Sequence, residues 1–177
     1  DLGAQTEFEL SPPEDDDGEG HYLNAHFGKS VSIDGTKAIV GADWAWDYQG
    51  RAYIYDCENV DWDCFGPDKI EPIELPPPGS VLSGHDYYGT SVAISSTGIG
   101  HGTAAVGSPG SNDYSGRAFA YVRGELPNGN IVWKETELVP SLPGGNLERR
   151  DRFGTSVSVS DDGKVIAVGA VGRNEGR

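Results

Sequence analysis

The sequence predicts an all-β fold of β-propeller blades, each with four antiparallel strands, that form an incomplete propeller within this chain. Two observations lead to this prediction. One order of features occurs three times, beginning at Phe27, Tyr88 and Phe153, so that the copies start 61 and 65 residues apart. Each copy holds short runs rich in β-branched and aromatic residues, and a repeat of this length and content is typical of a propeller blade.

The strands of a blade can be placed from the first two copies. In the third copy, polar and apolar residues alternate over 156–159, and Asp161-Asp162-Gly163 provides the turn to a second β-rich run. The first copy has Asp34-Gly35 at the same place between two β-rich runs. The expected strands cover residues 27–33, 38–42, 50–55 and 70–75 in the first copy, 88–94, 104–108, 116–121 and 131–139 in the second, and 156–159 and 165–168 in the third.

The chain divides by these copies into parts of one propeller domain. Residues 1–26 are expected to hold the outer strand of a preceding blade and an acidic linker, followed by blades over 27–87 and 88–152 and the first half of a blade over 153–177. An arc of blades exposes apolar faces, so we expect the remaining blades to come from a longer polypeptide or from other chains. The acidic run 14–19 favours a solvated loop over a calcium loop, because it lacks an alternating ligand pattern.

Charge and hydropathy exclude several classes of function. The 177 residues carry a formal net charge of −15, which disfavours binding to nucleic acids and to anionic membranes and favours cations or basic partners. No apolar run approaches the roughly 20 residues that cross a bilayer, so we expect no membrane insertion in this segment. The 26 glycines and 11 prolines agree with a chain rich in turns.

The two cysteines, Cys57 and Cys64, follow the third expected strand of the first blade. Their spacing suits a disulfide across a loop, and no other cysteine competes for either of them. Zinc is the alternative, but two cysteines do not fill a tetrahedral site and the four histidines show no matching spacing. A disulfide indicates an oxidising compartment, so we expect an extracellular or cell-surface location.

The loop after the second strand of the first blade is unusually aromatic. It contains Trp44, Trp46 and Tyr48, flanked by the carboxylates of Asp43 and Asp47. Such rings could stack on sugars or receive an apolar or cationic group of a partner. The other interpretation is that they pack against a neighbouring blade or another subunit, because large aromatic side chains are highly buried on average.

The three copies resemble FG-GAP repeats, which build β-propellers such as the head of integrin α subunits. The pairs Phe27-Gly28, Tyr88-Gly89 and Phe153-Gly154 match the first half of the repeat name, and the glycines Gly41, Gly107 and Gly169 match its second half. The resemblance covers residues 27–177. It implies that the aromatic rings lie buried between adjacent blades, while the glycines permit close approach of the backbone.

One departure from the family concerns calcium. Calcium-binding FG-GAP blades carry an Asp-x-Asp-x-Asp-Gly loop between their first two strands, and each copy lacks the three spaced carboxylates at 34–36, 95–103 or 161–163. The copies therefore resemble the calcium-free variant. We expect no cofactor and no metal; a structural calcium ion stays an alternative that the loop spacing does not support.

The sequence contains no recognisable catalytic motif, and we expect a protein that is not an enzyme, although blades can also combine to form an active site. The leading hypothesis is an extracellular adhesion or assembly module whose propeller contacts a protein partner, copies of itself, or the rest of a longer chain. The alternative is a carbohydrate-binding module in which Trp44, Trp46 and Tyr48 stack on a glycan.

Overall fold

The computed structural model describes residues 10, 12–13, 25–57, 71–77, 84–97, 101–140 and 146–172. The expected outer strand near the N-terminus and the acidic run lie almost wholly outside these described residues. The strands are β1 (Phe27–Asp34), β2 (Lys37–Ala42), β3 (Arg51–Asp56), β4 (Ile73–Glu74), β5 (Ser91–Ser95), β6 (Thr103–Ser108), β7 (Arg117–Glu125), β8 (Ile131–Glu137), β9 (Phe153–Val159) and β10 (Ile166–Ala170), and two short helical turns are α1 (Ala45–Tyr48) and α2 (Ser111–Tyr114).

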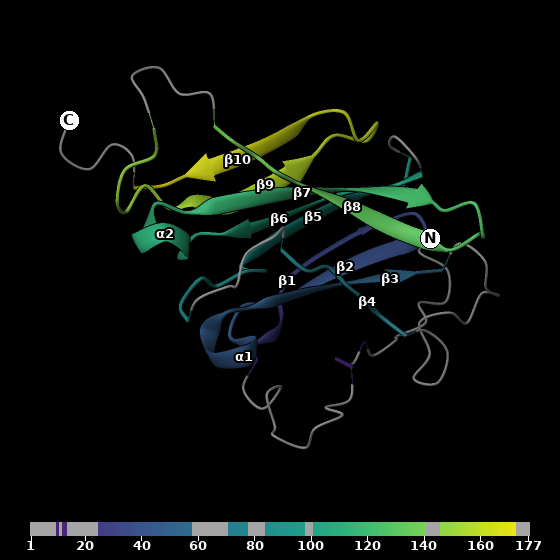
Figure 1. Ribbon diagram of the computed structural model, residues 1–177, viewed down its shortest axis with the longest axis horizontal. Coiled ribbons are helices and arrows are strands. Elements are labelled where there is room, and N and C mark those ends of the chain that lie inside the picture. Colours follow the sequence, from purple (N-terminus) through teal and green to yellow (C-terminus); the bar gives the residue numbers. More distant parts are fainter. Residues whose placement is uncertain are drawn as a thin grey trace, which may run out of the picture.

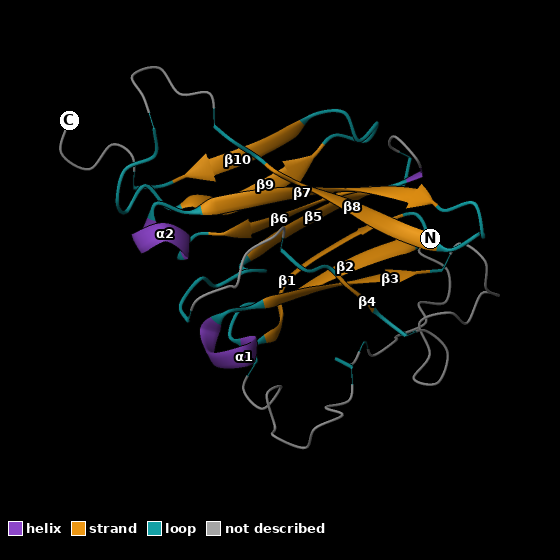
Figure 2. Cartoon of the chain, in the orientation of Figure 1, coloured by secondary structure: helices purple, strands orange, loops and turns teal. Residues whose placement is uncertain are grey.

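The strands form three antiparallel sheets in chain order. The first is β1-β2-β3-β4, the second β5-β6-β7-β8, and the third pairs β9 with β10. The sheets are stacked in layers, with α1 and α2 at the same end of the stack (Figures 1 and 2). The predicted fold class is therefore confirmed: the described residues form two blades of four antiparallel strands and a two-stranded third sheet, as in an incomplete propeller.

The core lies mainly between the first two blades. Ile39 and Ile54 of the first blade pack with Tyr88, Val106 and Phe119 of the second. A second cluster covers the other face of the first blade. Strand β2 is buried along its whole length, and its side chains alternate between the two clusters, as the period of two in a strand requires.

Adjacent blades meet along a seam at their inner strands, where glycines allow close backbone contact. A Cβ atom on Gly41 would lie 2.0 Å from the carbonyl oxygen of Gly89, and one on Gly107 would lie 1.9 Å from that of Gly154. A serine hydroxyl joins each pair of blades at the same place, since Ser30 donates to Gly89 O at 2.8 Å. The second seam repeats this contact, with 2.9 Å from the hydroxyl of Ser91 to Gly154 O.

Buried polar groups also join the first two blades. The side chain of Asp56 lies between two buried cations, with 3.1 Å to Lys37 Nζ and 3.3 Å to Arg123 Nε. The hydroxyls of Tyr88 and Tyr121 are 2.5 Å apart, and Tyr121 also donates to the carbonyl of a proline that follows β4. These contacts fix the relative position of the two blades, because each buried group needs its partner.

Several strand ends differ from those expected from the sequence: β7 runs to Glu125 and β9 begins at Phe153, and two further differences have a physical reason. Strand β4 covers only Ile73–Glu74 rather than 70–75, because Pro72 and Pro76 flank it and cannot donate to the ladder. Strand β5 begins at Ser91 rather than at residue 88. Tyr88 instead forms a parallel bridge with Gly50 of the first blade, so the aromatic-glycine pair belongs to the seam.

Candidate functional site

One end of the sheet stack, which we call the loop face, is built from equivalent segments of the three sheets. It comprises α1, α2 and the residues that precede β1, β5 and β9 (Figure 1). The amides of Trp44, Gly110 and Gly172 donate at 3.1 Å to the carbonyls of Ala25, Asp86 and Asp151, respectively. These residues occupy equivalent positions, so the three sheets offer comparable backbones with different side chains.

The turns α1 and α2 contain left-handed residues that are not glycine. In α1, Trp46, Asp47 and Tyr48 have φ values of 54°, 54° and 65°. In α2, Asn112, Asp113 and Tyr114 repeat this pattern at 53°, 57° and 65°. Each such residue costs roughly 1–2 kcal/mol relative to the right-handed region, and backbone strain of this kind clusters at functional sites.

The left-handed turns display a row of stacked rings on the loop face. The ring of Trp44 stacks on His26 at 3.7 Å between centroids and meets Tyr48 edge-on at 5.1 Å. Tyr48 stacks on His85 at 5.1 Å and lies 6.2 Å from Tyr87. Tyr87 is 6.5 Å from Tyr114. We call these six residues the aromatic row: His26, Trp44, Tyr48, His85, Tyr87 and Tyr114.

The aromatic row reaches the surface at five of its six members, since only Tyr87 is partly buried. The exposed fractions are 40% for Trp44, 38% for Tyr48 and 39% for Tyr114. Burial and the neighbouring Tyr114 hydroxyl raise the pKa of Tyr87 above its ordinary value. The row is thus a mostly apolar band that crosses the first two blades.

The structure separates the loop residues that the sequence grouped together. Trp44 and Tyr48 belong to the exposed row. Trp46 points inward instead, where it packs on the second core cluster, with Arg51 5.0 Å above its ring. Asp43 is buried, with one carboxylate oxygen 3.2 Å from His26 Nδ1. Asp47 is exposed.

Sequence reasoning missed His26, His85, Tyr87 and Tyr114 as members of the row. A signal for Tyr114 was present, since it precedes the glycine of the second Gly-Arg-Ala motif by two residues, as Tyr48 does in the first. The other three come from segments between blades. Only the fold brings these segments against the turns.

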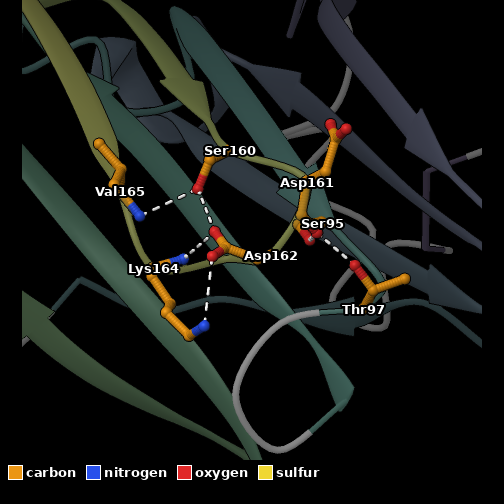
Figure 3. A network of polar contacts seen from close by, with 7 residues as sticks. All are labelled: Ser95, Thr97, Ser160, Asp161, Asp162, Lys164 and Val165. Carbon is orange, nitrogen blue, oxygen red and sulfur yellow. Dashed lines mark hydrogen bonds and ion pairs between the residues drawn. The ribbon is translucent and has the colours of Figure 1, made fainter.

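At the opposite end of the sheet stack, the turn face, hydrogen bonds link the first turns of successive blades. Asp34 Oδ2 of the first blade accepts from the amide and hydroxyl of Ser96, at 2.7 and 3.0 Å. These hydrogen bonds lower the pKa of Asp34. In the second blade, Ser95 and Thr97 donate to the carbonyl of Asp161 (Figure 3).

The third turn is closed by its own carboxylate. Asp162 Oδ1 accepts from Ser160 Oγ at 2.7 Å and from the amide of Lys164 at 3.1 Å, and the lysine ammonium lies 3.3 Å from Oδ2 (Figure 3). These contacts lower the pKa of the carboxyl group. Among the described residues, no three metal-ligating side chains gather at one place.

The predicted disulfide falls partly outside the described residues. Cys57 is buried directly after β3, and no described cysteine is a free thiol. Cys64 lies outside the described ranges. The pairing of the two residues therefore stays a prediction, and peptide mapping of the unreduced protein tests it.

A comparison with protein-family profiles matches residues 15–55 to the FG-GAP repeat. This stretch is an FG-GAP repeat. It includes β1, β2 and nearly all of β3, and the two later copies keep the same order of strands and seam glycines. FG-GAP repeats are structural and binding modules that commonly mediate protein interactions, typically in extracellular or cell-surface proteins. No curated protein matches the chain.

Neither of the two described helices could cross a membrane. Both are single turns of four residues, far too short for a membrane span.

Proposed function

We propose that the protein is an extracellular or cell-surface adhesion or assembly module whose loop face binds a protein partner. The observation that carries this proposal is the continuous aromatic row, with exposed rings from both α1 and α2. Trp and Tyr are the residues that most often dominate the energy of protein interfaces. Left-handed, strained turns at the same place in two blades support a role beyond packing.

The stacking geometry favours a protein partner over a glycan. A sugar ring stacks on an open aromatic face, whereas His26 covers one face of Trp44 and His85 covers one face of Tyr48. The edges of Trp44 and Tyr48 meet each other, which leaves an uneven band instead of a flat platform. Trp46, the third ring of the glycan hypothesis, packs inward.

An extracellular setting agrees with the predicted disulfide and with the typical location of FG-GAP repeats. We infer binding rather than catalysis from the nature of this family. The partner is either another protein or a second copy of this chain. The size of the protein in solution separates these two cases, because self-assembly makes the mass depend on concentration.

The test is a selection of peptides from a displayed library on the wild-type protein, with a glycan array in parallel. We expect enriched peptides whose binding falls at least about tenfold in the Trp44→Ala/Tyr48→Ala double variant. Leu126→Ala is the matched control, because Leu126 has a similar exposed fraction of 43% but lies in the hairpin between β7 and β8. Two results would contradict the proposal: peptides that bind the double variant as tightly as wild type, or glycans whose binding is lost in the double variant.

A further inference from the structure

The loop face has a pocket at the seam between the second and third sheets. This seam pocket has a volume of about 250 Å³. Its lining is mostly apolar and is formed chiefly by Tyr87, Pro109, Gly110, Tyr114, Arg152 and Val171. The rings of Tyr87 and Tyr114 line it together, so the pocket continues the aromatic row toward the third sheet.

A comparison of the two blades shows what such a pocket accommodates. Gly110 occupies in the second blade the position of Trp44 in the first, since the amides of both donate to equivalent carbonyls at 3.1 Å. In the first blade, the indole of Trp44 lies against His26 and Tyr48. Tyr87 and Tyr114 are the equivalents of those two residues. The seam pocket is therefore the place of an aromatic side chain that the second blade lacks.

The backbone around Gly110 leaves no room for a side chain at this position. A Cβ atom on Gly110 would lie 1.9 Å from the carbonyl oxygen of His85 and 2.6 Å from the ring of Tyr87. Both distances are far below ordinary contact, so the second blade cannot fill the pocket with a side chain at this position without a backbone shift. An aromatic group can reach it from another molecule.

Arg152, which lines the seam pocket, belongs to a short segment with two further arginines, in contrast to the acidic character of the chain. Arg149, Arg150 and Arg152 are exposed, and none of the three forms an ion pair with the described residues. Among the acidic residues in this segment, Asp151 is buried and accepts the amide of Glu148, whereas Glu148 itself is exposed. The exposed charges here sum to a positive value, although the chain has 28 acidic and 13 basic residues.

We propose that the seam pocket binds an acidic peptide segment through an aromatic anchor residue. The anchor enters between Tyr87 and Tyr114, as Trp44 does between its own neighbours, and acidic residues beside it pair with the arginines. This inference rests on the proposed function, because it names the partner of the same face. The net charge of the whole chain favours basic partners, and we expect the seam pocket to be an exception to this preference.

The pocket favours a peptide over an acidic sugar. Its two threonine hydroxyls already donate to carbonyls of their own turns: Thr90 to Tyr87 O and Thr155 to Arg152 O, both at 2.7 Å. Apart from the Arg152 guanidinium, the remaining lining offers few donors for the many hydroxyls of a sugar ring. An apolar anchor loses no hydrogen bonds on entering it.

The probe is a fluorescently labelled peptide of sequence Glu-Asp-Trp-Asp-Glu, and the readout is anisotropy with the intact protein. We expect saturable binding that weakens at least about tenfold when the peptide tryptophan is replaced by alanine, and by a similar factor in Arg152→Glu. Lys134→Glu is the control variant. It makes the same change of charge on an exposed residue of β8, away from the pocket. A Lys-Lys-Trp-Lys-Lys peptide should bind Arg152→Glu more tightly than wild type.

Three outcomes would overturn the inference. The first is no saturable binding of the acidic peptide, and the second is equal weakening by Lys134→Glu and Arg152→Glu. The third is displacement or replacement of the peptide by a uronic-acid oligosaccharide whose binding depends on Arg152, which would assign the pocket to a glycan. Selected peptides that depend on Trp44 and Tyr48 would leave the proposed function intact even if the acidic peptide fails to bind the seam pocket, so the two failures are distinguishable.

Discussion

The seam between blades can be tested with one added methyl group. Gly107 lies in β6 in an ordinary strand conformation, so alanine brings no backbone strain of its own. Its Cβ atom would lie 1.9 Å from Gly154 O, about 1.5 Å short of an ordinary contact of 3.4 Å. The carbonyl of Gly154 also accepts from Ser91, so the seam must open and weaken this hydrogen bond. We expect Gly107→Ala to lower the free energy of unfolding by about 3 kcal/mol.

Gly124→Ala is the matched control for this change. Gly124 also lies in a strand, β7, but an added Cβ there would meet Val132 at no less than 3.7 Å. Alanine restricts the unfolded chain more than glycine does, so this variant should be neutral or stabilised by up to about 1 kcal/mol. Urea unfolding monitored by circular dichroism measures both variants. If the free energies of unfolding of Gly107→Ala and Gly124→Ala lay within about 1 kcal/mol of each other, the close backbone contact at the seam would be refuted.

Two further predictions concern carboxylates. Asp56→Asn removes the negative charge between the buried Lys37 and Arg123 and should destabilise the protein by about 3–5 kcal/mol. The control is Glu137→Gln, which removes one charge of the partly exposed pair with Arg117. In the same urea assay, this variant should change the free energy of unfolding by less than about 1 kcal/mol. Because the folded pKa of Asp34 lies below its usual 3.8, its contribution is complete above that value and is lost as the pH falls through the folded pKa. The difference in urea midpoint between wild type and Asp34→Ala should therefore shrink in acid; a constant difference from pH 7 to pH 2 would contradict the hydrogen bonds seen at this carboxylate.

The repeated order of short motifs was enough to predict blades of four strands, because strand alternation and turn chemistry are local properties of a sequence. The ends of strands were less predictable where the seam competes with the sheet. Tyr88 pairs with Gly50 of the neighbouring blade, and this contact depends on how the blades stack. The direction of Trp46 could not be predicted either, since it follows from a left-handed backbone that its sequence does not favour.

The equivalent loop positions of the two blades differ: one seam is filled by a side chain of the chain itself and the other is left open. In the first blade, Trp44 occupies the space between His26 and Tyr48, so this seam is filled from within. In the second blade, Gly110 leaves the equivalent space open between Tyr87 and Tyr114. The backbone hydrogen bonds are the same in both places, so stability of the turn does not require the indole. The close approach of the His85 carbonyl requires glycine at position 110, and the apolar space that this leaves beside Arg152 is open to a group from another molecule.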